Sequence, residues 1–493
     1  MNIEIRKAKN GEDTAAADNM LLHSSYAPSR EAERFVQNLT FPFLPQIIIL
    51  IEPALSYSAP LIKEKFPQIK LGVVRFNSVF NQYNSSFDFV FNYSENNTFD
   101  VFLEKNFNEE TLMQIMFVEW EPSAKAFSSQ ITQIRKEIKA ALERAKTILV
   151  TRQYFEKKWF YNSAVFFKWI KNPLQLNGTI KKNTVILSSG PSLKNVIPFI
   201  KQNRNELFVL CLSSAISACL KNQIIPDLCM STDGGFWAGQ HLKKLNNNDI
   251  PLALALEGHC SKRILSKNKI LPLVYDDGIS LELAKVSDLK MTHAVRNGTV
   301  SGTALLFASE HCSKDIFLCG LDMAGQKGYQ HFQPNELENN ASLFDNRINT
   351  KEKRLTVSQF SSASLEVYRD WFIQNPLTLQ NRKVYRVIET SQKKNSLGWI
   401  QDIAPNDFSD LLQNNCNHNE KFEATATLYV PQNSGNTAEK VFEYLRKNQK
   451  KEVWKKNLFP LDYVALSHNP DNSSVSEKIE KDYTKLMEKI LNI

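Results

Sequence analysis

The sequence VILSSGPSLKN at residues 185–195 places a small, polar, glycine-containing turn directly after an apolar run. Gly190 allows a tight turn and lets a ligand approach the backbone, and Pro191 is suited to the entry of a helix. A helix that starts here offers N–H groups that bind anions. The stretch predicts a strand, a turn and a helix, and the turn is either a plain connection or a phosphate site. It is neither a G-K-[ST] phosphate loop nor a G-x-G-x-x-G fingerprint.

Five later apolar runs repeat this arrangement, because each ends in small or acidic residues. Their ends fall about 20–25 residues apart until the last one, which is the repeat of a strand plus a short helix. This regularity predicts an α/β fold with a central Rossmann-like, mostly parallel sheet. Ligands bind outside the carboxyl ends of such strands, so the polar endings should converge. The runs are residues 208–212, 228–230, 252–256, 273–275 and 316–319.

The rest of the chain divides around this central sheet. A helix from Pro28 and three apolar runs at 46–51, 70–76 and 87–91 predict a smaller N-terminal α/β domain. Apolar residues recur every three to four positions from 128 to 170, which predicts a long helix. After residue 398 the regularity fades, and short helical patterns predict a helical C-terminal region. The predicted boundaries are 1–125 for the N-terminal α/β domain, 126–180 for a helical linker, 181–395 for the central Rossmann-like domain and 396–493 for the helical C-terminal region.

The composition is typical of an ordinary soluble globular protein. The 493 residues exceed what one core usually serves, and 42% are hydrophobic and 23% charged. A net charge of +8 is spread along the chain, so nothing demands a nucleic-acid partner. The start has no signal-peptide core and no stretch is long and apolar enough to span a membrane, so we expect a cytoplasmic protein. The seven cysteines form no C-x-x-C pair and are expected to be buried, reduced thiols.

A second helix start follows at residues 296–308, RNGTVSGTALLFA. Ser301, Gly302 and Thr303 precede an apolar helix, so another N-terminus should face the same edge of the sheet. Two such starts favour a nucleotide over a single phosphate. The alternative is ordinary capping by Ser301 or Thr303.

Acidic and histidine residues at two strand ends could supply chemistry. Asp322 follows the run at 316–319, and His331 lies nine residues further on, beyond a glycine-rich loop. His331 is the best general-base candidate because an imidazole can take a proton near neutral pH, with His259 as a rival and simple exposure as the alternative. Asp233 could bind a sugar hydroxyl or a cation, or cap a helix. We take His331 and Asp233 as the candidate catalytic residues.

In this order, the motifs resemble those of the flagellin-modifying motility-associated factor (Maf) glycosyltransferases. Those proteins have a G-P-S-L turn, a later S-G-T helix start and a G-x-D segment before a histidine loop. The layout is also similar to bacterial sialyltransferases that use CMP-activated sugars. The resemblance covers about residues 20–390, and the nucleotide-binding residues that it implies, together with neighbouring strand-end serines, are Ser189, Gly190, Pro191, Ser192, Ser213, Ser214, Ser301, Gly302, Thr303 and Asp322.

The resemblance implies transfer of a nonulosonic acid, of the pseudaminic or legionaminic type, from its CMP form to Ser or Thr of flagellin. Flagellin would be the protein partner and the CMP-activated sugar the donor substrate. CMP would leave with its phosphate charge stabilised by helix N-termini and hydroxyl groups. No cofactor is expected, and the absence of paired H-x-H or D-x-D spacing gives no indication of Mg²⁺ or another metal.

The chain departs from these families at three places. Ser189 stands where relatives place Ala or Asn, and Leu212-Ser213-Ser214 lacks the Asn of the sialyltransferases. The Gly-rich turn expected after the first N-terminal strand is replaced by residues 52–57, EPALSY. Two alternatives therefore stay open: a pterin-type pyrophosphokinase, because the central domain also resembles archaeal hydroxymethylpterin pyrophosphokinases, and a non-catalytic flagellin-binding assembly factor.

Overall fold

The computed structural model describes residues 2–94, 97–323, 331–350, 363–379, 382–389, 396–414, 427–431 and 436–493. The chain forms two compact units. The first contains residues 1–156 and 452–485, and the second contains residues 157–451 and 486–493.

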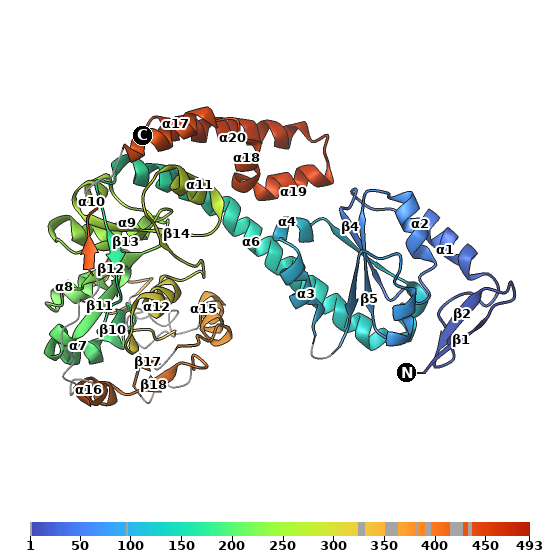
Figure 1. The fold of residues 1–493 in the computed structure, drawn as a ribbon, viewed down its shortest axis with the longest axis horizontal. Coiled ribbons are helices and arrows are strands. Elements are labelled where there is room, and N and C mark those ends of the chain that lie inside the picture. Colours follow the sequence, from blue (N-terminus) through green and yellow to red (C-terminus); the bar gives the residue numbers. More distant parts are fainter. Residues whose placement is uncertain are drawn as a thin grey trace. The chain divides into compact units, whose positions relative to one another are not determined.

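The first unit is built on a four-stranded parallel sheet in the order β6-β5-β4-β7. Every residue of the central strand β4 is buried, as expected of a parallel strand covered on both faces. In Figure 1, α1 and α2 lie on one side of β4 and β5, and α3 and α6 lie on the other. The strands are β4 (Ile47–Ile51), β5 (Lys70–Arg75), β6 (Phe89–Asn92) and β7 (Ile115–Glu119), and the helices are α1 (Pro28–Gln37), α2 (Ser58–Lys65), α3 (Phe99–Asn106) and α6 (Ser128–Trp169). The predicted strands and the long helix are confirmed.

Smaller elements complete the first unit. Three strands form an antiparallel sheet near the N-terminus, and helices from the C-terminal part of the chain join the unit. These elements are β1 (Ile3–Lys7), β2 (Asp13–Ala17), β3 (Met20–Leu21), α4 (Glu109–Leu112), α5 (Glu121–Ala126), α18 (Glu452–Leu458), α19 (Pro460–His468) and most of α20 (Ser473–Leu491).

The second unit is built on a ten-stranded sheet in the order β15-β14-β13-β12-β11-β10-β16-β17-β18, with β8 beside β14. All of its strand pairs are parallel, so the predicted Rossmann-like sheet is confirmed. The strands are β8 (Asn172–Pro173), β10 (Asn183–Leu187), β11 (Leu207–Leu212), β12 (Leu228–Ser231), β13 (Leu252–Ala255), β14 (Lys269–Val274), β15 (Thr292–His293), β16 (Ile316–Cys319), β17 (Val384–Val387) and β18 (Gln401–Ile403); β9 (Gln175–Asn177) pairs with β19 (Thr427–Tyr429).

Helices cover the faces of this sheet. Helix α12 packs Ala304, Leu305 and Ala308 into the same core as Ile186 and Leu210 of the central strands. The helices are α7 (Leu193–Gln202), α8 (Ile216–Lys221), α9 (Phe236–Leu242), α10 (Lys262–Lys267), α11 (Gly278–Val286), α12 (Val300–His311), α13 (Glu336–Ser342), α15 (Ala363–Gln374), α16 (Pro405–Asn414) and α17 (Thr437–Lys447).

Strand β10 is the point at which the strand order reverses. The chain moves from β10 to β11 and onward to β15 on one side, and returns to β16 on the other side. Ligands of open α/β sheets bind at such a reversal, outside the carboxyl ends of the strands. The glycine-containing turn at 188–192 follows β10 directly, so it lies at this position (Figure 1).

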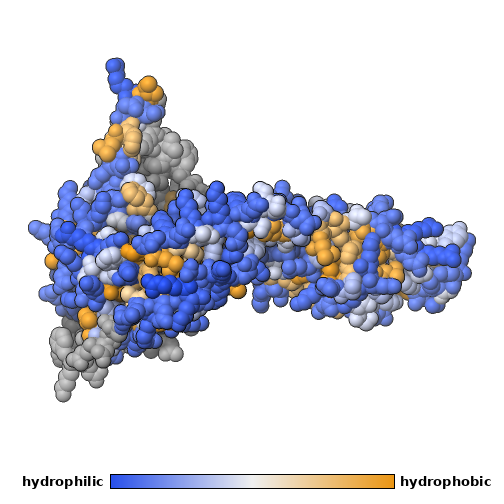
Figure 2. Space-filling view, turned by 90° about the horizontal axis from the view of Figure 1, so that it is seen from above, coloured by the Kyte–Doolittle hydropathy of each residue, from blue (hydrophilic) through white to orange (hydrophobic). Residues whose placement is uncertain are grey.

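The remaining findings concern the C-terminal region, the cysteines and the surface. Strand β18 extends the central sheet beside β17, which the prediction of a helical region after residue 396 missed because the strand has only three residues. The six cysteines within the described residues are buried and unpaired by disulfides, as predicted. Among the described residues, no helix combines the length and apolarity that a membrane crossing requires. The face shown in Figure 2 is mostly hydrophilic, with apolar side chains in separate patches.

Candidate functional site

The turn after β10 is fixed by contacts with the end of β16. The N–H groups of Ser188 and Gly190 donate to the carbonyl oxygens of Cys319 and Gly320, each at 2.8 Å. A Cβ atom on Gly190 would lie 2.4 Å from the oxygen of Gly320, so only glycine fits. Gly320 has φ +73° and would place a Cβ atom 2.3 Å from the oxygen of Ser188. The two strand ends therefore interlock through these glycines.

Asp322 supplies the anion at the start of α7. Its carboxylate accepts the N–H of Ser192 at 2.9 Å and also accepts the hydroxyl of Ser192. Burial raises the pKa of Asp322, and the bonds from Ser192 oppose that rise. Both predicted nucleotide-binding residues are thus engaged with each other. The hydroxyl donor that we assigned to a ligand at Ser192 is directed to Asp322 instead.

The first helix start is also more closed than predicted. The N–H groups of Leu193, Lys194 and Asn195 donate to carbonyl oxygens three residues earlier, at 3.0–3.3 Å. The expectation of free N–H groups for a phosphate is therefore wrong at these three positions. The tight turn around Pro191 brings those carbonyl groups within reach.

The second helix start, at α12, is capped by a residue that the sequence analysis did not name as a cap. The hydroxyl of Thr299 accepts the N–H of Gly302 at 2.9 Å, so Thr299, rather than Ser301 or Thr303, is the cap. Asn297 donates to Thr303 at 3.2 Å and fills the space where a Cβ atom of Gly302 would lie. The hydroxyl of Ser301 lies 3.5 Å from that of Ser188. The two predicted helix starts are therefore adjacent at the end of β10.

His331 belongs to a segment that crosses the ends of β10 and β11. The N–H of the next residue, Phe332, donates to the oxygen of Ser189 at 2.7 Å, and the side-chain amide of Asn335 donates to the oxygen of Ser214 at 3.0 Å. The predicted site residues therefore gather around the ends of three neighbouring strands, β11, β10 and β16. They are residues 189–192, 213–214, 301–303, 322 and 331. The glycine-rich loop before His331 lies outside the described residues.

Glu336 anchors the segment that contains His331 to the helices α8 and α9. Its carboxylate accepts the hydroxyl of Ser217 and lies 2.7 Å from Nδ1 of His241. Burial acts to raise the pKa of Glu336, but the hydrogen bonds from His241 and Ser217 outweigh it and lower that pKa. The carboxylate therefore stays ionised and holds the segment in place.

Asp233 lies further along the sheet, after β12. Its side chain is exposed and accepts the N–H of Gly235 at 2.8 Å, which is a local turn contact. Its backbone oxygen accepts the N–H of His259 at 2.9 Å. Burial lowers the pKa of His259, the rival general base. No described contact joins Asp233 to the group around Ser189.

A cluster around Glu257 was not predicted from the sequence. The buried carboxylate of Glu257 accepts two N–H groups of Arg296, at 2.9 and 3.0 Å, and the hydroxyl of Ser280 at 2.5 Å. The guanidinium of Arg296 lies 4.7 Å from the ring centroid of Trp159 and 4.4 Å from that of Tyr275. Glu257 follows β13 and Arg296 precedes the second helix start. The only sequence signal was the position of each charge at an apolar boundary.

The carboxylates of Glu257 and Asp277 balance the positive charge of Arg296. Burial alone would lower the pKa of Arg296, but its bonds to Glu257 and Asp277 raise that pKa above the usual value. Burial also raises the pKa of Tyr275 to about 12. The cluster therefore holds the loop before α12 against the ends of β13 and β14.

Within the described residues, no group of three or more His, Cys, Asp or Glu residues is arranged to hold a metal ion.

The N-terminal turn that replaces the expected Gly-rich turn has an unusual backbone. Glu52, Ala54 and Ser56 adopt φ values of +43°, +45° and +62°, a region that favours glycine. Holding non-glycine residues there costs free energy, so the surroundings must enforce it. All three residues are buried.

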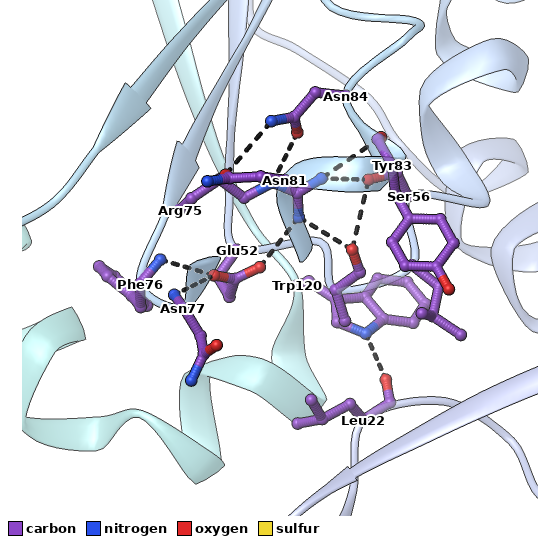
Figure 3. Close-up of polar contacts among 12 residues, drawn as sticks. Leu22, Glu52, Ser56, Arg75, Phe76, Asn77, Asn81, Tyr83, Asn84 and Trp120 are labelled. Atoms are coloured by element: carbon purple, nitrogen blue, oxygen red, sulfur yellow. Dashed lines mark hydrogen bonds and ion pairs between the residues drawn. The ribbon is translucent and has the colours of Figure 1, made fainter. Parts of the chain in front are cut away.

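The side chain of Arg75 makes polar contacts with this turn, as Figure 3 shows. Its guanidinium donates to Glu52 and to the oxygen of Ala54, each at 2.9 Å, to the hydroxyl of Ser56 at 2.6 Å and to Asn84 at 2.8 Å. Both side chains of the Glu52–Arg75 pair are fully buried. The guanidinium of Arg75 thus bonds to all three residues of the turn that have positive φ.

Comparisons with known proteins agree with two of the resemblances. The family of MptE-like proteins, described as 6-hydroxymethylpterin diphosphokinase MptE-like, matches residues 125–328, which is less than half of the chain. An uncharacterized protein of Treponema pallidum (strain Nichols) is 28% identical over 312 residues, which cover 62% of this chain and 67% of that protein.

A solved structure extends the comparison to the whole chain. The MAf glycosyltransferase from Magnetospirillum magneticum AMB-1 matches with a TM-score of 0.54 and 12% identity, over 99% of this chain and 89% of that one. The resemblance to Maf glycosyltransferases that the motifs predicted is confirmed at the level of the fold.

Proposed function

We propose that this protein is a Maf-type glycosyltransferase that transfers a nonulosonic acid, of the pseudaminic or legionaminic type, from its CMP form to a Ser or Thr hydroxyl of flagellin. The similarity in fold to a MAf glycosyltransferase supports glycosyl transfer as the type of reaction. The observation that carries the site is the position of His331, whose neighbour Phe332 bonds to Ser189 at the point where the strand order reverses.

In the proposed reaction, His331 acts as the general base. Its imidazole takes the proton of the acceptor hydroxyl as that oxygen attacks the anomeric carbon of the sugar. The bond between that carbon and the phosphate oxygen breaks, and CMP leaves with the electron pair. The hydroxyl groups of Ser188 and Ser301 lie 3.5 Å apart beside the start of α12. In this proposal they donate hydrogen bonds to the departing phosphate. No step of this proposal requires a metal ion.

The test is an assay of purified protein with a CMP-nonulosonate and unmodified flagellin. We expect CMP release and a mass increase of flagellin, and we expect His331→Asn to reduce both by about 100-fold or more, because a general base contributes at least that factor. His293→Asn is the matched control, since His293 is exposed and pairs only with Asp276 among its described partners. If the wild type shows no transfer to flagellin and releases no CMP, the proposal is refuted.

A second candidate is a diphosphokinase acting on a hydroxymethylpterin, which the family match over residues 125–328 favours. His331 lies outside that match. Incubation with ATP and 6-hydroxymethylpterin separates the two candidates. Formation of a pterin diphosphate would support the diphosphokinase, and the absence of that product together with CMP-dependent transfer would exclude it.

A non-catalytic flagellin-binding factor would instead leave flagellin modification in cells unchanged in the His331→Asn variant.

A further inference from the structure

We propose that Glu338 is a positioning residue that fixes the tautomer and orientation of His331; this rests on the proposed role of His331 as general base. The carboxylate of Glu338 lies 3.3 Å from Nδ1 of His331 and accepts the backbone N–H of the same residue at 3.2 Å. One oxygen, Oε1, makes both contacts. The imidazole is therefore held relative to its own backbone.

Glu338 is itself placed by the start of α13. The side chain of Asn335 caps this helix by accepting the N–H groups of Leu337 at 3.0 Å and Glu338 at 3.5 Å. Glu338 lies in the first turn and is only 5% exposed. A carboxylate in such a position is favoured by the helix N-terminus and by its hydrogen bonds. Its position is thus set by the backbone and does not depend on His331 alone.

This geometry determines which ring nitrogen is basic. An acceptor next to Nδ1 keeps the proton on Nδ1, so the lone pair of the neutral ring is on Nε2. Nε2 is then the atom that takes the proton of an acceptor hydroxyl. The negative charge of Glu338 stabilises the imidazolium that forms, which is the task of the carboxylate in histidine-based triads.

The chain provides its own comparison for this role. Glu336 is two residues earlier on the same helix and also binds a histidine, but that histidine is His241 of α9, whose ring is buried. Glu336 therefore anchors the segment without touching His331. The segment is also held by the bond from Phe332 to Ser189. Variants at position 338 should fold because these anchors remain.

The experiment compares Glu338→Leu, Glu338→Gln and Glu336→Gln in the full chain. Ring ¹⁵N chemical shifts of His331, assigned by their loss in His331→Asn, report the tautomer directly. We expect the Nδ1–H form in the wild type and in Glu336→Gln, and a shift toward the Nε2–H form in Glu338→Leu. Glu338→Gln keeps an acceptor oxygen, so the tautomer should persist while the charge is lost.

Kinetics of CMP release give the second readout. We expect Glu338→Leu to lower kcat by at least about tenfold with little change in KM for the donor, because the base is misoriented while donor contacts remain. Glu338→Gln should fall between this variant and the wild type. The proposal is overturned if the wild type shows the Nε2–H form, or if Glu338→Leu leaves the tautomer unchanged. If the wild type releases no CMP, the proposed function fails, whereas the ring shifts still decide the role of Glu338.

Discussion

Replacement of Arg75 by methionine tests whether the N-terminal turn is held by a buried ion pair. The substitution keeps the apolar stem and removes a guanidinium that donates to Glu52, Ala54, Ser56 and Asn84. The carboxylate of Glu52 would remain buried, bonded only to backbone N–H groups at residues 76 and 77. Breaking a buried pair by removing one partner costs about 3–5 kcal/mol, so we expect a loss of that size in the first unit.

The double variant Glu52→Gln/Arg75→Met isolates the interaction. Each single variant leaves an uncompensated buried charge, whereas the double variant leaves none. Its cost should therefore fall short of the sum of the single costs by about 2–3 kcal/mol. Burial raises the pKa of Glu52, and the charge and hydrogen bonds of Arg75 oppose that rise, so the removal of Arg75 should raise the pKa of Glu52 further.

Arg135→Met provides the matched control in the same unit. Arg135 also makes a two-bond pair with a carboxylate, that of Glu119, at 2.6 and 2.7 Å, but its side chain is 61% exposed. Exposed pairs contribute about 0–1 kcal/mol. Hydrogen exchange measured by mass spectrometry on peptides that cover residues 47–58 and 70–80 gives the opening free energy of the turn. A cost for Arg75→Met no larger than that for Arg135→Met, or an additive double variant, would refute the reasoning.

Three further predictions concern the second unit. Gly190→Ala should destabilise it by about 1–3 kcal/mol and abolish activity, because the new Cβ atom would lie 2.4 Å from a backbone oxygen; thermal unfolding and the CMP-release assay check this. Thr299→Ala should cost about 1 kcal/mol by thermal unfolding through loss of the cap of α12, whereas Thr299→Ser should cost little. Because the pKa of Glu336 is lowered by its partners in the folded state, its stabilisation is present above the ordinary glutamate pKa of about 4.3 and is lost as pH falls through the lowered value. Glu336→Gln should therefore flatten the fall of the unfolding free energy as the pH decreases below about 4.3; an unchanged slope would contradict this.

The central sheet could be predicted from the sequence because the information that specifies it is local. Runs such as 185–187 and 316–319 are continuously apolar and end in small or acidic residues, which is typical of strands buried on both faces. The parallel order then places their ends at one edge. For this reason the pattern of apolar runs was enough to predict that Ser189, Ser301 and His331 lie near one another.

The roles of individual side chains could not be predicted in the same way, because they depend on contacts between distant residues. Asp322 was assigned to a ligand, yet it closes the start of α7 through Ser192, 130 residues earlier, once β16 lies beside β10. Several small residues near 300 could each have capped α12, and only the path of the chain selects Thr299. The pairing of Glu338 with His331 had no signal at all, since a glutamate in the first turn of a short helix is ordinary. A parallel sheet thus fixes where its polar endings meet, whereas the choice between ligand contact and internal support is made by partners that only the folded chain brings together.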